Sequence, residues 1–189
     1  MKRTMRWLLT LLLAALAAHP ALAQKVKLAT SLGDVVIQLD ADKAPKTVAN
    51  FVQYVKDGHY DGLIFHRVIA TFMIQGGGYD ADMKEKPTRP SIPLESRNGL
   101  SNLRGTIAMA RTNVPDSASS QFFINVVDNQ RLDAANAPDG NGYAVFGKVV
   151  SGMDVVDKIR DVPVGNKAGH QNVPQQPVVI RKATLESSK

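Results

Sequence analysis

Short apolar segments recur along most of this 189-residue chain, and they constrain its fold more than any other feature. Each segment has the length of one strand, and stretches rich in Gly, Pro, Asn and Asp separate the segments. Residues 26–30 and 35–39 flank a short turn containing Gly33, which is typical of a hairpin. The longest separating stretches, 80–102 and 128–142, are predicted loops. The remaining predicted strands cover residues 63–69, 71–75, 105–110, 121–126, 143–150 and 177–184.

Two segments have helical spacing instead. Pro45 suits a first helical turn, the apolar residues from Val48 to Val55 follow a period of about 3.6, and Gly58 suits a C-terminal cap. A second, short helix is predicted over residues 154–159. Many short strands with two helices favour a closed barrel or a sandwich whose open ends the helices cover. This architecture by itself leaves the function open.

Residues 1–23 have the layout of a secretory signal peptide. A basic start precedes an apolar run at 7–18 and a small-residue cleavage site at 21–23. The run is too short to span a bilayer comfortably, so an uncleaved anchor is the disfavoured alternative. We expect the mature chain, residues 24–189, to form one domain without stable membrane association. The leader predicts export, with the periplasm as the expected destination and full secretion as the alternative.

Composition excludes several classes of function. The chain has no cysteine, which rules out disulfides and thiol catalysis. Loss of the leader lowers the formal net charge from +6 to +3, and the remaining basic residues are scattered, so nucleic acid binding is not expected. His59, His66 and His170 lack metal-ligand spacing, and the serines at 117–120 lack an evident His–Asp partner. The glycines at 76–78 lack the P-loop lysine, so a tight turn is predicted there.

The segment 65–78 carries the strongest chemical signal. It sets Arg67 and Gln75 among large apolar side chains, with no nucleophile and no set of metal ligands nearby. Such a surface suits a reaction that makes and breaks no bond, because it can hold an apolar group and direct a fixed positive charge at it. We interpret the neighbouring His66 as a structural histidine that faces away from Arg67 and is hydrogen-bonded inside the protein.

Three ordered segments resemble one family. Residues 65–77 resemble the central signature of the cyclophilin-type peptidyl-prolyl cis-trans isomerases, 105–124 the second and 143–149 the third. The resemblance extends from about residue 26 to residue 185, and the loops and leader are most similar to those of exported bacterial members. It implies a mainly β fold, a closed eight-stranded antiparallel barrel capped by two α-helices, which makes residues 24–189 a cyclophilin-like isomerase domain.

The resemblance also implies a substrate groove on the outer face of the barrel. Arg67 matches the catalytic arginine, and Gln75 and Gln121 match polar groups that bind the substrate backbone. Ala110 and the main chain of Arg111 match the groove edge that pairs with an extended peptide. No metal or cofactor is implied. Tyr143 stands where many relatives have a histidine. The walls and floor of the proline pocket are matched by Phe72, Met73, Phe123 and Leu132.

Three positions depart from the family pattern at the groove rim. Arg131 stands where relatives often have a tryptophan that helps to bind cyclosporin, and Tyr143 also differs, so we expect weak inhibition by cyclosporin. Arg111 replaces a residue that is more often small and polar. Together, Arg111 and Arg131 predict a more basic rim and better processing of peptides with acidic residues beside the proline.

The leading hypothesis is an exported, monomeric prolyl isomerase that acts on proline-containing polypeptides and assists the folding of exported proteins. The rival is a proline-binding chaperone module whose catalysis is incidental. Both need the same groove, but a pure binder would not need Arg67. A barrel that stores a small ligand in its lumen is a third alternative. It is disfavoured because six phenylalanines and many Val and Ile residues would fill a small interior.

Overall fold

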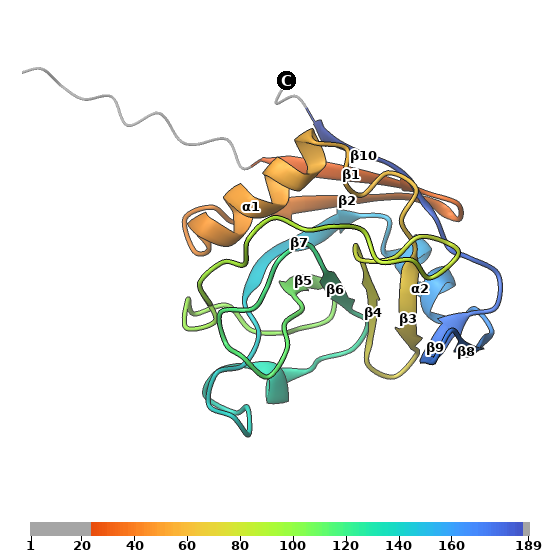
Figure 1. Cartoon of the computed structure of the whole chain (residues 1–189). Helices are drawn as coiled ribbons and strands as arrows, with labels where there is room; N and C mark the ends of the chain where they lie inside the picture. Colours follow the sequence, from red (N-terminus) through yellow and green to blue (C-terminus); the bar gives the residue numbers. More distant parts are fainter. Residues whose placement is uncertain (1–23, 187–189) are drawn as a thin grey trace, which may run out of the picture.

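The computed structural model describes residues 24–186, and these form a curled antiparallel sheet of eight strands with two helices (Figure 1). The predicted mainly β, cyclophilin-like barrel with two helices is confirmed. The signal peptide predicted for residues 1–23 lies outside the described residues, and so do residues 187–189.

The strands are paired in the order β10-β1-β2-β7-β5-β6-β4-β3. Only a short contact joins the two ends of this sheet. Ile64 and Val179 form an isolated bridge, and beside it the Phe65 N–H donates to the Val178 carbonyl at 3.0 Å. The bounds are β1 (Lys25–Thr30), β2 (Gly33–Leu39), β3 (Phe65–Ile69), β4 (Met73–Gly76), β5 (Thr106–Met109), β6 (Phe122–Asn125), β7 (Val145–Ser151) and β10 (Ile180–Glu186).

The two helices pack on the barrel at separate places. Helix α1 (Pro45–Lys56) packs against β10, and α2 (Met153–Arg160) packs against β2, β3 and β4. The carboxylate of Glu95 accepts hydrogen bonds from the backbone N–H groups of Lys46 and Thr47 at 3.1 and 2.8 Å, which satisfies the first turn of α1. Among residues 24–186, neither helix is long and apolar enough to cross a membrane.

Aromatic side chains fill the barrel interior. The Phe51 ring lies 5.1 Å from that of Phe146, 5.2 Å from that of Tyr60 and 5.6 Å from that of Phe122, between ring centroids. All four side chains are fully buried. Edge-on and tilted rings at these separations pack to the density of a normal core. The filled interior agrees with the expectation against a ligand store in the lumen.

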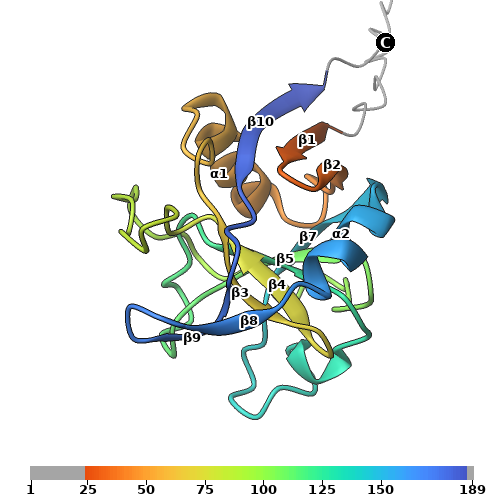
Figure 2. The same cartoon turned by 90° about the vertical axis from the view of Figure 1, so that its right-hand side faces the viewer.

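The structure also contains a hairpin that was not predicted from the sequence. Strands β8 (Val164–Lys167) and β9 (His170–Pro174) form a separate hairpin, which lies beside β3 in both views (Figures 1 and 2). Most of its residues are polar or exposed, so the sequence shows no alternation of apolar residues there. The turn uses Ala168 and Gly169, both with positive φ. This hairpin adds a wall beside the face that carries Arg67.

Candidate active site

One row of paired residues crosses four strands on the outside of the barrel. Arg67 on β3 pairs with Gln75 on β4, Gln75 pairs with Phe123 on β6, and Phe123 pairs with Ala108 on β5. Directly paired residues project to the same face of a sheet. The Arg67 guanidinium donates to Gln75 Oε1 at 3.2 Å, and Gln75 Nε2 donates to Gln121 Oε1 at 2.9 Å. The pairing therefore brings the predicted cation and both glutamines together.

An apolar cluster adjoins this polar row and is separate from the barrel core. Phe123 belongs to it, whereas Phe122 belongs to the core, so the two rings lie on opposite sides of the sheet. The Phe123 and Tyr143 rings meet edge to face, 5.6 Å apart. The cluster contains every side chain predicted for the proline pocket. Its predicted members are Phe72, Met73, Ala110, Phe123, Leu132 and Tyr143.

His66 does not lie where the sequence predicted. A β-bulge interrupts the pairing of β3 with β4 between Phe65 and Arg67, so His66 is an extra residue in the strand. Strict alternation fails at a bulge, and His66 lines the same cavity as Arg67, Gln75 and Gln121. The prediction that it faces away from Arg67 is therefore wrong. Its side chain is buried, and Nδ1 has no hydrogen-bond partner among the described residues.

This burial predicts a pH-dependent stability. Burial, with electrostatic repulsion from His170 and Arg67, lowers the pKa of His66 from 6.5 to about 4. Between these pH values the unfolded chain binds more protons than the folded one, so the free energy of unfolding falls as pH drops from 6.5 to 4. His66 accounts for up to about 3 kcal/mol of that loss. When the free energy of unfolding is measured in urea across this range, its slope against pH should be shallower in His66→Gln than in the wild type. Equal slopes in wild type and His66→Gln would contradict the assignment.

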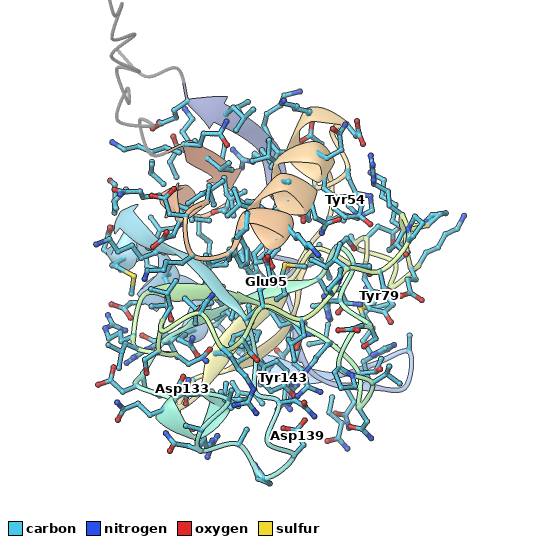
Figure 3. The ribbon with its side chains drawn as sticks, turned by 90° about the vertical axis from the view of Figure 1, so that its left-hand side faces the viewer. Tyr54, Tyr79, Glu95, Asp133, Asp139 and Tyr143 are labelled. Carbon is cyan, nitrogen blue, oxygen red and sulfur yellow. The ribbon has the colours of Figure 1, made fainter. Side chains whose placement is uncertain are left out.

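Arg111 contributes less to the groove rim than the sequence predicted. Its guanidinium pairs with the Asp139 carboxylate and donates to the Gly142 carbonyl at 2.8 Å, and its side chain is only 3% exposed. It also stacks over the Tyr143 ring, 4.7 Å from the centroid (Asp139 and Tyr143 are labelled in Figure 3). The ion pair neutralises its charge, so the part of the basic rim assigned to Arg111 is wrong. Its main chain makes no backbone hydrogen bond within residues 24–186, which leaves that edge open to a peptide.

Arg131 lies on the other side of the apolar cluster. Its guanidinium carbon is 4.8 Å from the centroid of the Phe72 ring, which is a cation–π contact. It precedes Leu132 in a short 3-10 helix, η1 (Gln130–Leu132), inside the stretch predicted as a loop. The exposed Arg131 thus covers one face of the Phe72 ring and keeps a positive charge at the rim.

Three buried asparagines support the apolar cluster and were missed by sequence reasoning. Asn129 Nδ2 donates to the Phe72 carbonyl at 2.8 Å and to Asn125 Oδ1 at 2.8 Å. Asn125 in turn donates to Asn102 Oδ1 at 3.2 Å. Because buried amides are costly unless they are paired, this network fixes the segments that carry Phe72 and Leu132. The available signal was Asn125, a polar residue inside an apolar strand.

The tight turn predicted at residues 76–78 is a bend: Gly76 ends strand β4, and Gly77 and Gly78 follow it. Gly77 has φ +86°, and a Cβ there would lie 2.9 Å from the Ser120 carbonyl oxygen. A Cβ on Gly78 would lie 2.7 Å from the side chain of Gln121. Gly78 therefore leaves the space in which Gln121 extends toward Gln75. The glycine run serves the polar row and not a phosphate.

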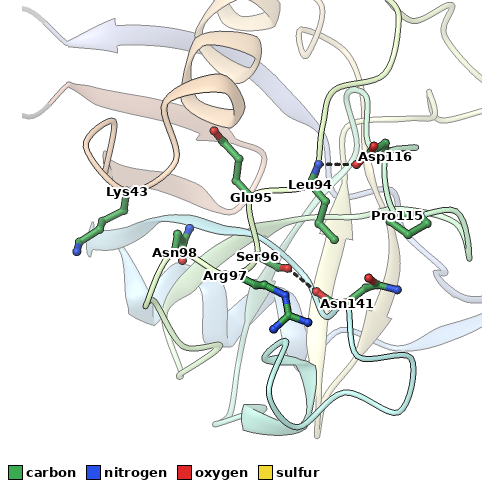
Figure 4. A pocket seen from close by; sticks show the side chains of 9 residues that line it. All are labelled: Lys43, Leu94, Glu95, Ser96, Arg97, Asn98, Pro115, Asp116 and Asn141. Carbon is green, nitrogen blue, oxygen red and sulfur yellow. Dashed lines mark hydrogen bonds between the residues drawn. The ribbon is translucent and has the colours of Figure 1, made fainter.

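A cavity of about 510 Å³ lies elsewhere, between loops near the start of α1 (Figure 4). None of the predicted site residues lines it. Two hydrogen bonds join its lining residues to each other: the Leu94 N–H donates to Asp116, and the Ser96 hydroxyl donates to the Asn141 carbonyl. These hydrogen bonds hold neighbouring loops together around the cavity. Within residues 24–186, no group of three or more His, Cys, Asp or Glu side chains is placed to hold a metal ion.

Comparison with known proteins places this geometry in one family. Residues 25–185 match the family model described as cyclophilin type peptidyl-prolyl cis-trans isomerase/CLD. The chain is 54% identical over 172 residues to a peptidyl-prolyl cis-trans isomerase of Acinetobacter baylyi, covering 91% of this chain and 90% of the relative. It is 54% identical over 157 residues to peptidyl-prolyl cis-trans isomerase B of Escherichia coli, covering 82% and 96%.

Solved structures agree. A cyclophilin type isomerase from Cryptosporidium parvum has a TM-score of 0.72 and 25% identity, covering 88% of this chain and 99% of that one. A second structure of it, in the presence of the dipeptide Ala-Pro, has the same TM-score and 26% identity, covering 87% of this chain and 100% of that one. The family model spans nearly all of the described residues, and both bacterial relatives are more than half identical over most of their length. This chain therefore belongs to the cyclophilin-type peptidyl-prolyl cis-trans isomerases.

Proposed function

We propose that Arg67 is the catalytic residue of this isomerase and that the apolar cluster around Phe123 holds the proline ring. The observation that carries this proposal is the cross-strand row, which sets the guanidinium of Arg67 and the amide of Gln75 in line with Phe123. Gln75 and Gln121 bind the substrate main chain, and the free main chain of Arg111, next to Ala110, pairs with an extended peptide.

The chemistry needs only a positioned cation and an apolar wall. Amide resonance keeps an X–Pro bond planar, with a rotational barrier of about 18–20 kcal/mol. In the twisted transition state this resonance is lost, and the proline nitrogen becomes pyramidal and can accept a hydrogen bond. A guanidinium directed at that nitrogen stabilises the twisted form more than either planar isomer. Arginine suits this role because it stays charged and holds its donors in a rigid fork.

The surroundings strengthen this effect. The hydrogen bond from Arg67 to Gln75 limits the rotation of the guanidinium before substrate arrives. Phe123 and Met73 are almost fully buried in the apolar cluster, so the proline ring is held where the dielectric is low. Each tenfold rate gain needs about 1.36 kcal/mol, so a few such contacts supply a large acceleration.

We further propose that the enzyme is exported, acts in the periplasm and assists the folding of exported polypeptides. The basic start, apolar run and small-residue cleavage site of residues 1–23 support this proposal. Expression of the full chain in a bacterium with a periplasm, followed by fractionation and N-terminal sequencing, tests it. The expected product starts at Gln24 and is found in the periplasm. A cytoplasmic product that retains residues 1–23 would refute export.

A refolding assay separates catalysis from chaperoning. The substrate is a denatured exported protein whose slow refolding step is prolyl isomerisation, which takes on the order of tens of seconds or longer without a catalyst. Amounts of the isomerase far below those of the client should accelerate the slow phase. If acceleration required equimolar amounts, the proline-binding chaperone module would be the better description.

Cyclosporin should inhibit this enzyme weakly, only at concentrations far above nanomolar. The position that often carries a cyclosporin-binding tryptophan in relatives is Arg131, whose charged group lies over the Phe72 ring. A hydrated cation offers the apolar inhibitor less contact than an indole ring. Inhibition of peptide isomerisation measures this, and Arg131→Trp should increase sensitivity. Half-inhibition of the wild type at low nanomolar cyclosporin would disprove the prediction.

A further inference from the structure

A polar cavity of about 440 Å³ lies beside the candidate active site. Its sheet wall is formed mainly by His66, Arg67, Gln75 and Gln121, and its opposite wall is the hairpin tip at residues 169–172. Arg67, Gln75 and Gln121 also belong to the polar row of the site. A polypeptide whose proline lies against Phe123 therefore has this cavity beside its flanking residues.

The hairpin wall is attached to the barrel by specific contacts. The Tyr79 ring lies 4.8 Å from the His66 ring and 5.0 Å from the His170 ring, so it joins the sheet to β9. Lys167 Nζ donates to the Ala81 carbonyl at 2.6 Å. The cavity is thus a built part of the fold, since aromatic contacts and a hydrogen bond fix both of its walls.

The lining has an unbalanced charge. It contains the Arg67 cation, two histidines and several side-chain amides, but no carboxylate. Within residues 24–186, Arg67 has no carboxylate oxygen within 4.0 Å, whereas four other arginines do. His66 is 4% exposed, and its Nδ1 lacks a partner. A cavity with positive charge, spare N–H donors and an unsatisfied buried group suits a ligand that is anionic and accepts hydrogen bonds.

We propose that this cavity is a subsite for an acidic side chain of the client polypeptide, located a few residues from the proline. The proposal rests on the isomerase function and is independent of export. Arg67 can serve both sites because a guanidinium has five N–H donors, and its hydrogen bond to Gln75 engages one nitrogen. The side-chain amides of Gln171 and Asn172 offer further donors from the hairpin wall.

The test compares peptides that contain one proline and carry Asp, Asn or Ala at successive positions on either side of it. Their C-termini are amidated, so the Asp side chain is the sole carboxylate. An Ala peptide with a free C-terminus tests whether a C-terminal carboxylate can bind in the cavity instead. At one position the Asp peptide should have a KM about three- to tenfold lower than the Asn peptide at low salt. High salt should remove most of this ratio.

Two hairpin variants locate the effect. The double variant His170→Ala, Gln171→Ala changes the cavity wall at partly or fully exposed positions and should reduce the difference in KM between the Asp and Asn peptides. Asn166→Ala is the matched control, because Asn166 is exposed on β8 and does not line the cavity. It should keep the wild-type ratio. The ring NMR signals of His66 and His170 should shift with the Asp peptide and not with the Asn peptide.

Two outcomes would overturn the subsite. One is equal KM for Asp and Asn peptides at every position at low salt. The other is a ratio that survives the hairpin double variant and disappears in Arg131→Ala, which would assign the charge preference to the rim. The Ala peptides keep these outcomes distinct from failure of the isomerase function, because the wild type must still turn them over.

Discussion

Replacing Arg67 with alanine should reduce kcat/KM on an X–Pro peptide by about 10²–10³-fold, which is the usual loss when one preorganised transition-state donor is removed. The reason is specific to the row that crosses β3, β4 and β6. Arg67 is the only cation in it, and Gln75 offers a neutral amide that cannot replace a full charge near the imide nitrogen. A protease-free cis-to-trans assay on a proline peptide measures the loss.

Two controls make this result interpretable. Arg67 is only partly buried and no carboxylate of the described residues pairs with it, so Arg67→Ala should unfold in urea at nearly the wild-type midpoint. Arg67→Lys keeps the charge but loses the planar fork, and it should recover only part of the activity. Activity within a fewfold of wild type in the alanine variant would rule out Arg67 as the catalytic residue. If client binding persists while turnover collapses, the enzyme hypothesis holds over the chaperone module.

Truncation of Phe122 should mainly reduce stability, whereas truncation of the neighbouring Phe123 should mainly reduce activity. Phe122 is fully buried among Phe51, Tyr60 and Phe65, so Phe122→Ala leaves a closed cavity and should cost about 3–5 kcal/mol of unfolding free energy. Phe123 is in the smaller outer cluster, where solvent and neighbouring side chains can fill the space more easily. Phe123→Ala should therefore lower kcat/KM by about ten- to a hundredfold, with the smaller loss of stability.

Urea unfolding and peptide turnover, measured on both variants, test this pair. Phe122→Leu is the milder companion if the alanine variant does not fold, and it should still lose stability while keeping turnover. Phe122 and Phe123 are adjacent in one strand and chemically identical, so each serves as the control for the other. Equal losses of activity in the two folded variants would contradict the assignment of Phe123 to the proline pocket.

The sequence predicted the barrel because strand and helix signals there depend on local periodicity. Alternation along residues 25–30 and the spacing from Val48 to Val55 each reflect one buried face. The hairpin of β8 and β9 escaped prediction because its polar residues pack on another element and not on a core of their own. The bulge at His66 escaped for a related reason: an extra residue is visible only against the partner strand, and β4 lies beyond a turn.

The candidate site divides in the same way. Resemblance identified Arg67, Gln75 and the apolar cluster, and the cross-strand register brings them together. The charge of Arg111 could not be judged from the sequence, because its partner Asp139 lies 28 positions away in a predicted loop. The asparagine network is similar, since Asn102, Asn125 and Asn129 come from different segments that meet only after folding.

The barrel wall has few hydrogen bonds where the isolated bridge between Ile64 and Val179 joins the two ends of the sheet. Elsewhere neighbouring strands exchange hydrogen bonds along their length, whereas here a single bridge and its flanking bonds complete the circle. Few hydrogen bonds have to open here before water reaches the amide protons of this contact. Phe65 at this contact is two residues from Arg67. Local opening of this contact would shift the Arg67 guanidinium relative to Phe123 while the other strand pairs of the sheet stay hydrogen-bonded.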